Sequence, residues 1–470
     1  MKRIAVVDNE KLKDMQLKLH IQKLCPINRT GTECIKLEQT KLFIDELTCI
    51  GCGICVKAAP DAIRIINLPQ ELHQDPIFRY GKNSFALYSL PVPVFGQIVG
   101  IIGRNGIGKS TAISLLAGLL RPNFGHWDAT PTDKEIINYF KGTQAQAYFE
   151  RLYGGKIKIS YKPQQVELIQ KQYKGKVKDL LARVDENNNL RKVAQALDLL
   201  SILDHDLASV SGGELQRIAI AGAALKSANV YIFDEPTSYL DIKQRLNVTS
   251  FIRSLVNEQT AVLLVEHDLI VLDYLADTIH ITYGKEQTYG VVSQPKAAKT
   301  GINTYLGGYL KEENVRFRDK QVHFAKRPPF IQHKTPVLLS WQGIQKTFFT
   351  SGKQTFHLQA MQGSVLQGEV VGIIGENGIG KTTFVKLLAG ILEPDQGSLT
   401  FEQEKKTLVF GTSHAASHQH NTSHTPAVPH TPAALHPLVS SNPKFHVSYK
   451  SQYLEPNDAL VGQVLHAALA

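Results

Sequence analysis

The sequence predicts an α/β protein in which a small cysteine-containing domain precedes two nucleotide-binding domains. The pattern G-x-x-x-x-G-K-[ST] occurs twice, and each copy follows a short apolar run that is typical of a buried strand. All five cysteines lie between Cys25 and Cys55. The 470 residues are enough for about three domains, which accommodates this arrangement.

The first 72 residues are predicted to form the cysteine-containing domain. C-I-G-C-G-I-C, from Cys49 to Cys55, has the C-x₂-C-x₂-C spacing of bacterial ferredoxins, whose thiolates hold an iron–sulfur cluster. The fourth cysteine of that pattern is replaced by Ala59. In two-cluster ferredoxins the fourth cysteine of each run binds the other cluster, so Cys25, which precedes Pro26, supplies the missing ligand.

We therefore expect a ferredoxin-like domain with one [4Fe–4S] cluster. Its expected ligands are Cys25, Cys49, Cys52 and Cys55. The positions that a second cluster would need are apolar, and we expect core side chains to fill that vacated site: Leu12, Leu17, Ile21 and Ala59. Cys34 is left over and is expected to be structural. A degenerate, metal-free domain is the alternative.

The first nucleotide-binding domain is predicted to span residues 73–290. Its phosphate loop, G-R-N-G-I-G-K-S, follows the apolar run Ile98 to Ile102. Such a loop surrounds phosphates with backbone N–H groups, and its serine hydroxyl binds Mg²⁺. The nucleotide contacts expected here are Gly103, Asn105, Gly106, Gly108, Lys109, Ser110 and Thr111. Tyr80 and Phe85 are the candidates for stacking on adenine, with ordinary core packing as the alternative.

Further motifs follow this loop in order. Gln164, in Y-K-P-Q, is expected to reach Mg²⁺ and the attacking water. S-G-G-E-L-Q-R begins a helix whose N-terminus, with Ser211 and Gly213, can bind an anion. S-Y-L-D, at 238–241, is expected to form a loop at the interface between two paired nucleotide-binding domains.

Two acidic side chains and a histidine complete the expected catalytic set. The strand V-Y-I-F-D-E-P ends in Asp234, expected to hold Mg²⁺, and Glu235, expected to act as general base. His267 follows another apolar strand and is expected to contact the terminal phosphate, while Lys109 neutralises the charge on the transferred phosphoryl group. Singly, these residues also suit surface or core roles. Five motifs in this order favour ATP hydrolysis.

The second nucleotide-binding domain is predicted at residues 331–470. Its loop follows the expected strand Val370 to Ile374, and Phe349 or Phe356 is the candidate on the adenine side. The contacts expected here are Gly375, Asn377, Gly378, Gly380, Lys381, Thr382, Thr383 and Gln452, with Thr382 also binding Mg²⁺. The His-rich segment 411–437 cannot build a core and is expected to be a disordered surface insertion, with metal binding as the alternative.

These residues together resemble one family, the class E ATP-binding-cassette proteins, ribosome-recycling factors also called RNase L inhibitors. The resemblance covers nearly all of the chain. Besides the motifs above it rests on R-I-A-V-V at 3–7, I-I-N-L-P at 65–69, F-R-Y-G at 78–81, Y-F-K-G-T at 139–143 and G-I-N-T-Y-L-G-G-Y-L-K-E-E-N-V-R-F-R at 301–318. The last stretch resembles the family's hinge, which we expect at 291–330.

The resemblance implies a cytoplasmic, monomeric ATPase that splits ribosomes after termination or rescue. Its implied partners are the small ribosomal subunit, ribosomal RNA and release-factor-like rescue proteins. Residues 139–149 match the family's helix-loop-helix insertion, which touches the small subunit. The basic runs Arg151–Lys178 and Lys296–Arg327, and the net charge of +10, then predict contacts with RNA phosphates. No apolar stretch approaches the roughly 20 residues of a membrane span.

Two departures from the family matter. One cluster is expected instead of two. After the second phosphate loop, the sequence shows no second copy of S-G-G-E-L-Q-R, which is the signature of ATP-binding cassettes. It also shows no second strand ending in carboxylates like Asp234 and Glu235, and no counterpart of His267. It lacks about 125 residues relative to the first half. Each ATP of a cassette pair lies between one phosphate loop and the other half's signature, so this chain completes neither site by itself.

Several functional hypotheses remain open from the sequence. The leading hypothesis is an ATP-hydrolysing recycling factor, with the chain as a fragment of a longer protein. The alternative is a nucleotide-dependent ribosome-binding regulator without efficient hydrolysis. A swapped homodimer would repair the first site. A transporter ATPase or a ferredoxin-type electron carrier explains less of the sequence.

Overall fold

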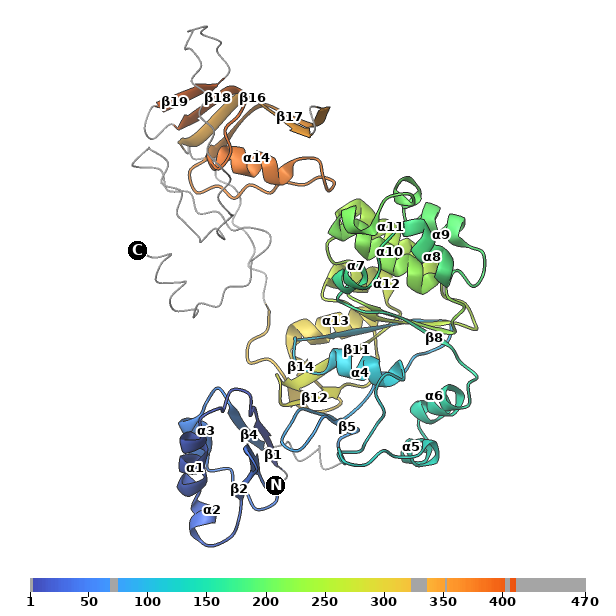
Figure 1. Cartoon of the computed structure of the whole chain (residues 1–470), viewed down its shortest axis with the longest axis vertical. Helices are drawn as coiled ribbons and strands as arrows, with labels where there is room; N and C mark the ends of the chain where they lie inside the picture. Colours follow the sequence, from blue (N-terminus) through green and yellow to red (C-terminus); the bar gives the residue numbers. More distant parts are fainter. Residues whose placement is uncertain (1–2, 68–74, 323–335, 351–352, 402–405, 411–470) are drawn as a thin grey trace. The chain divides into compact units, whose positions relative to one another are not determined.

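A computed structural model describes residues 3–67, 75–322, 336–350, 353–401 and 406–410. The chain divides into two compact units, Met1–Ala325 and Lys326–Ala470 (Figure 1). Within the described residues, no helix has both the length and the apolar character that a membrane crossing requires.

Residues 3–67 of the first unit form two small antiparallel sheets and three short helices. The strands β1 (Arg3–Val7) and β4 (Ile63–Asn67) pair with each other, as do β2 (Ile35–Glu38) and β3 (Lys41–Ile44). The helices are α1 (Met15–Leu24), α2 (Pro26–Arg29) and α3 (Ile54–Ala58). Leu12, Ile21 and Ala59 are buried in the core of this region, and Leu17 packs against them. The four residues expected at the vacated cluster site thus belong to one apolar core.

A nine-stranded, mainly parallel sheet forms the centre of the first unit. Its middle strands are β8 (Ile159–Lys162), β9 (Val230–Asp234), β10 (Ala261–Val265), β7 (Ile98–Gly103) and β11 (Thr278–Lys285), side by side in this order and all parallel. The strands β12 (Tyr289–Val292), β6 (Ala86–Leu87) and β5 (Phe78–Arg79) continue past β11, and β13 (Lys296–Ala297) also pairs with β11.

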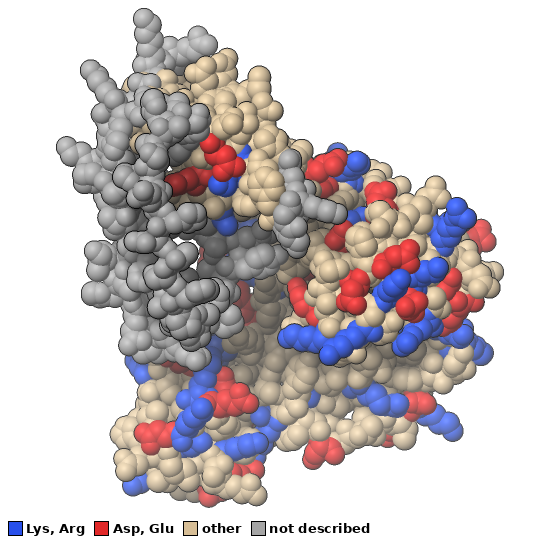
Figure 2. All heavy atoms as spheres, turned by 45° about the horizontal axis from the view of Figure 1, so that its top comes forward, with Lys and Arg blue, Asp and Glu red and all other residues tan. Residues whose placement is uncertain are grey.

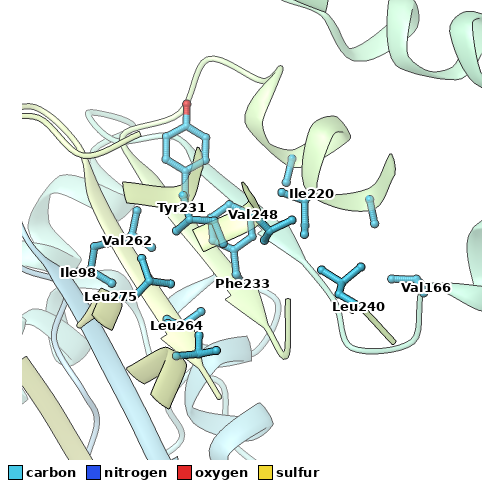
Figure 3. Close-up of a cluster of buried hydrophobic side chains, with 14 of the residues drawn as sticks. Ile98, Val166, Ile220, Tyr231, Phe233, Leu240, Val248, Val262, Leu264 and Leu275 are labelled. Atoms are coloured by element: carbon cyan, nitrogen blue, oxygen red, sulfur yellow. The ribbon is translucent and has the colours of Figure 1, made fainter. Parts of the chain in front are cut away.

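The apolar runs form these strands because both faces of the sheet are covered. Alternate side chains of β9 enter different cores: Tyr231 and Phe233 pack on one face, and Val230 and Ile232 pack on the other. Figure 3 shows the first of these cores, where Phe233 lies among aliphatic side chains from neighbouring strands and helices.

Helices connect the strands and cover the sheet. The helices α5 (Asp133–Tyr139) and α6 (Gln144–Tyr153) overlap residues 139–149, where a helix-loop-helix is expected, and pack on each other, with the Phe140 and Phe149 rings stacked. The described helices of this region are α4 (Lys109–Leu116), α5 (Asp133–Tyr139), α6 (Gln144–Tyr153), α7 (Glu167–Gln172), α8 (Val177–Val184), α9 (Leu190–Ala196), α10 (Gly212–Ala224), α11 (Ile242–Ser254), α12 (Leu269–Leu275) and α13 (Ala298–Gly307). The hairpin of β14 (Tyr309–Leu310) and β15 (Val315–Arg316) follows α13.

The loop between β5 and β6 attaches the N-terminal region to the sheet. Asn83 is 2% exposed, and its side chain bonds the backbone of Ile44 and the carbonyl of Ala5. Arg79 forms a bidentate ion pair with Glu46, with N–O distances of 2.9 and 2.5 Å. These buried contacts are specific because an unpaired amide or charge at the same place would destabilise the interface.

The second unit is built on a long hairpin of β16 (Val337–Thr350) and β17 (Lys353–Leu366). The strands β18 (Gln396–Phe401) and β19 (Lys406–Phe410) extend this antiparallel sheet, and α14 (Lys381–Leu388) follows the second phosphate loop. Residues 370–374, expected as a strand, have no regular structure, and Val370 is 93% exposed. The expectation was wrong because β7, the matching strand, lies between β10 and β11, whereas residues 370–374 have no strand partner in the described part of this unit.

The basic runs are only partly at the surface. Lys162 and Lys296 are 1% and 7% exposed, so neither is available for the RNA phosphate contacts predicted from the two runs. The remaining described bases of the first run are exposed: Arg151, Lys156, Lys158, Lys171, Lys174, Lys176 and Lys178. Figure 2 shows blue Lys and Arg side chains interspersed with red Asp and Glu on the face that it presents.

Candidate nucleotide site

The first phosphate loop connects β7 to α4. Gly106 and Gly108 have φ angles of +74° and +91°, which a residue with a side chain adopts only with strain. A Cβ at Gly108 would come within 2.6 Å of the Phe85 ring. Lys109 opens α4 and donates to the carbonyls of Gly103 and Arg104, at 2.9 and 2.8 Å. Its Nζ therefore lies inside the loop, and burial lowers the pKa of Lys109 to about 8.

Most predicted residues of this half meet at one open cavity. The cavity is lined by Tyr80, Phe85, Asn105, Gly106, Gly108, Lys109, Ser110, Thr111, Gln164, Asp234, Glu235 and Gln287. Gly103 lies beneath it at the end of β7, where a Cβ would collide with Thr282. Gln287 was missed by sequence reasoning because it belongs to no motif. Its N–H donates to the Gly106 carbonyl at 2.8 Å, which fixes the loop against the β11–β12 turn.

The carboxylate of Glu235 is at the centre of the polar contacts. Gln164 Nε2 donates to its Oε1 at 2.9 Å, and His267 Nε2 lies 3.4 Å from the same oxygen. Ser238 Oγ donates to the other oxygen at 3.2 Å. Burial, and then the charge of Lys109, lowers the pKa of His267, so the imidazole is predominantly neutral at pH 7.

Asp234 is more deeply buried than Glu235 and ends β9. Burial and the charge of Glu235 raise its pKa to about 6, despite the opposing effects of Lys162 and Lys109. Hydroxyl, amide and carboxylate oxygens suit Mg²⁺, and Ser110, Gln164 and Asp234 bring such oxygens to this one cavity. The donor set therefore fits the ion that the sequence predicts.

The two aromatic candidates have different environments. Tyr80 is 55% exposed, and its hydroxyl hydrogen-bonds Thr111 Oγ1 at 3.0 Å. Its ring packs edge-to-face with Phe78, and Tyr80 lines the cavity. Phe85 instead packs beneath Gly108 and supports the loop. Tyr80 is thus the better placed of the two for stacking on a base.

The signature residues lie elsewhere in the same unit. Ser211 caps α10 by accepting from the Glu214 N–H, and Glu214 accepts in return from Ser211 N and Oγ. Ser211 and Gly213 are not among the residues that line the cavity of the first loop. The structure therefore does not bring them together with Lys109.

The second phosphate loop repeats the local geometry of the first. Lys381 donates to the carbonyls of Gly375 and Glu376 at 2.6 and 2.7 Å. Gly378 and Gly380 have φ angles of +81° and +102°. Thr382 and Thr383 follow Lys381 in the first turn of α14, and Asn377 lies within the loop.

The aromatic candidates of the second unit differ as well. A Cβ at Gly380 would come within 2.8 Å of Phe356, which makes Phe356 the counterpart of Phe85. Phe349 is 66% exposed. Gln452 and the segment 411–437 lie outside the described residues.

A separate cavity in the N-terminal region is lined only by cysteines and isoleucines. These residues are Cys25, Cys34, Cys49, Cys52, Cys55, Ile27, Ile35, Ile44, Ile50, Ile54 and Ile65. Cys34 was expected to be a structural residue apart from the ligands, but it lines the same cavity and is 1% exposed. Cys34 lies immediately before β2, and its place in the same cavity as Cys25 could not be inferred from spacing alone.

The thiols that line this cavity are the donor type that an iron–sulfur cluster requires. Among the described residues, no group of three potential ligands is arranged to hold a single metal ion. A [4Fe–4S] cluster differs because each thiolate binds a different iron, so its ligands stand farther apart. A cavity with thiols as its polar groups, apolar walls and a Gly51 N–H donated to Cys49 Sγ at 3.4 Å suits such a cluster.

Comparisons with known proteins agree with this geometry. The family model described as ABC transporter matches residues 94–238 and 358–453. An uncharacterized ABC transporter ATP-binding protein of Methanocaldococcus jannaschii is 47% identical over 408 residues, covering 86% of this chain and 66% of that protein. A Saccharomyces cerevisiae protein named translation initiation factor RLI1 is 44% identical over 406 residues, covering 84% of this chain and 66% of its own length.

A solved structure gives the same result. It is described as a model of ribosome-bound archaeal Pelota and ABCE1, and it matches with a TM-score of 0.78 and 48% identity over 84% of this chain and 66% of that one. The chain thus spans about two thirds of the length of the relatives that it matches. By its two matched cassette segments and these relatives, the chain belongs to the class E branch of the ATP-binding-cassette family.

Proposed function

We propose that this chain acts as an ATP-binding and ATP-hydrolysing ribosome-recycling factor, which uses cassette closure to split ribosomal subunits in termination or rescue. The observation that carries the proposal is the meeting of Lys109, Gln164, Asp234 and Glu235 at one cavity. A related protein named as a translation initiation factor, and a related structure described as ribosome-bound, support the ribosomal role.

The residues of the cavity have distinct proposed roles. Lys109 and the loop N–H groups bind the phosphates, and Tyr80 stacks on the base. Glu235 accepts a proton from the attacking water, which Gln164 orients, and neutral His267 donates a hydrogen bond to the terminal phosphate. Ser110, Gln164 and Asp234 would hold Mg²⁺, and Thr382 would do so in the second unit; the bound ion would neutralise charge on the phosphate oxygens.

The N-terminal cavity has a proposed structural group. We assign Cys25, Cys49, Cys52 and Cys55 as ligands of one [4Fe–4S] cluster, on the basis of the ferredoxin spacing and of the five thiols that share the cavity. Residues 1–72 would then form the cluster domain, 73–290 the first cassette, 291–330 the hinge and 331–470 the second cassette.

The ribosomal contacts are proposed from the surface. The α5–α6 insertion would meet the small subunit, and the exposed bases between Arg151 and Lys178 would contact RNA phosphates. Release-factor-like proteins would act beside it, in keeping with the related ribosome-bound structure of Pelota and ABCE1.

One observation favours the alternative, a nucleotide-dependent ribosome binder without efficient hydrolysis. In the described part of the second unit, the apolar residues Val370 and Ile374 are 93% and 83% exposed. A phosphate loop whose preceding strand is not packed would bind nucleotide with less precision, because the loop position depends on that strand.

The test compares the wild-type chain with Glu235→Gln and with a surface control, Glu258→Gln, for ATP turnover and for co-sedimentation with small ribosomal subunits. Loss of turnover in Glu235→Gln alone, with nucleotide-dependent co-sedimentation retained, supports the proposal. Equal turnover in all three proteins places hydrolysis elsewhere. Nucleotide-dependent co-sedimentation without turnover in any of them favours the alternative, and association with membranes only would reject both.

A further inference from the structure

The backbone of Glu235 has an unusual conformation. Its φ angle is +47°, in the left-handed region that costs a residue with a side chain about 1–2 kcal/mol. Such a conformation persists only where surrounding contacts hold it, and it tends to occur at functional sites. The contacts that hold Glu235 are therefore part of how its carboxylate is aimed.

Lys162 is the first of these contacts. It ends β8 and is 1% exposed, and its Nζ lies 2.8 Å from the Asp234 carbonyl and 3.3 Å from the Glu235 carbonyl. A buried ammonium group is costly unless it is hydrogen-bonded, and a charged donor binds a carbonyl more strongly than a neutral one. Lys162 thus binds the main chain of both acidic residues.

Gln216 is the second contact and comes from α10. It is fully buried on α10, and its Nε2 donates to the Glu235 carbonyl at 2.6 Å. Its Oε1 has no hydrogen-bond partner among the described residues. An unpaired buried amide oxygen destabilises the fold, so stability alone does not account for a glutamine at this position.

We propose that Lys162 and Gln216 are positioning residues that hold the main chain of Glu235 in its left-handed conformation and thereby aim its carboxylate at Gln164 and His267. The Glu235 carbonyl accepts from both side chains, while the Glu235 N–H donates to the Val265 carbonyl at 2.9 Å. Three elements, β8, α10 and β10, therefore fix one residue. This role rests on the proposed function of Glu235 as general base.

The hydrogen bond from Gln216 also connects helix α10, which Ser211 caps, to Glu235. Gln216 lies in the second turn of the helix that Ser211 caps. A rigid shift of α10 would pull on the Glu235 carbonyl directly through Gln216.

The test uses the full chain with Lys162→Met, Gln216→Met and Lys162→Arg. Ser160→Ala is the matched control, because Ser160 is also on β8, is 1% exposed and bonds the Ala223 carbonyl of α10 without touching Glu235. We expect the two methionine variants to lower kcat for ATP by about tenfold or more with KM within twofold, since mispositioning affects the transition state more than binding. Lys162→Arg should recover most of kcat, and Ser160→Ala should leave it unchanged.

Hydrogen exchange of the segment 235–240 provides a readout that does not need turnover. Exchange should become at least fivefold faster in Lys162→Met and Gln216→Met, with core strands β9 and β10 unchanged, and should not change in Ser160→Ala. If wild-type turnover is absent while this pattern holds, the proposed ATPase fails and the positioning role stands. Unchanged exchange in both methionine variants, or an equal loss of protection throughout the unit, overturns the positioning role.

Discussion

Replacing Asp234 by asparagine tests the electrostatics of the site through its effect on stability. Asp234 is 3% exposed, and burial with the nearby charge of Glu235 raises its pKa from 3.8 to about 6. In the unfolded chain the carboxyl keeps its ordinary pKa. Folding therefore takes up a proton between about pH 4 and pH 6, and stability falls as the pH rises through that interval. The difference of about two between the pKa values corresponds to a destabilisation of about 3 kcal/mol at pH 7.

We expect Asp234→Asn to raise the free energy of unfolding of the first unit at pH 7.5 by up to about 3 kcal/mol. The gain should shrink as the pH falls towards 4, because the wild-type carboxyl is then neutral as well. At the same time, affinity for Mg²⁺–ATP should fall, since asparagine removes the charge that binds the ion. Catalytic groups that reduce stability in this way are common.

The assay is urea unfolding between pH 5 and pH 8, followed by fluorescence. The chain has two tryptophans, Trp127 in the first unit and Trp341 in the second, so a Trp341→Phe background reports the unfolding of the first unit alone.

Asp277→Asn is the control, for which the expected change in stability has the opposite sign. Burial alone would raise the pKa of Asp277, but hydrogen bonds from Arg253 and the Ile98 N–H outweigh it and lower that pKa, so the control should lose stability at neutral pH. A loss of stability in Asp234→Asn at pH 7.5, or a gain independent of pH, would refute the reasoning.

Three further predictions follow from the site. Tyr80→Ala should weaken ATP binding about fivefold, whereas Tyr80→Phe should retain most of the affinity, because stacking contributes about 1 kcal/mol; equal losses by calorimetry would contradict the stacking role. Gly108→Ala should weaken ATP binding by about tenfold or more, since its φ of +91° and the Phe85 ring both oppose a Cβ. Gly118→Ala, where φ is +71° and nothing lies within 4 Å, should affect stability only. Cys55→Ser should lower the iron of anaerobically purified protein below about two per chain while Cys34→Ser should not, and an equal effect of both would show that the ligands are misassigned.

Local motifs predicted the parts of the structure that depend on short segments. The loop from Gly103 to Ser110 and the strand that ends at Asp234 were predicted correctly, because glycines and short apolar runs determine the backbone conformation locally. The strand expected at 370–374 failed because a parallel strand needs neighbours from distant sequence, which periodicity does not reveal. The basic run around Lys162 misleads for the same reason, because it indicates that Lys162 lies at the surface. Lys162 is in fact buried against Asp234 and Glu235, which are more than 70 residues away in the sequence.

The loop between β5 and β6 has a thermodynamic consequence for the N-terminal region. Together with Arg79 at the end of β5, it spans seven residues, of which Tyr80 and Phe85 line the cavity and Arg79 and Asn83 bond the N-terminal region. A nucleotide that orders this loop reduces the entropy lost when the N-terminal region docks, and docking in turn reduces the entropy lost on nucleotide binding. Linkage makes the two effects equal in size. Deleting contacts such as the Arg79–Glu46 pair should then lower nucleotide affinity by the same factor by which nucleotide tightens the docking.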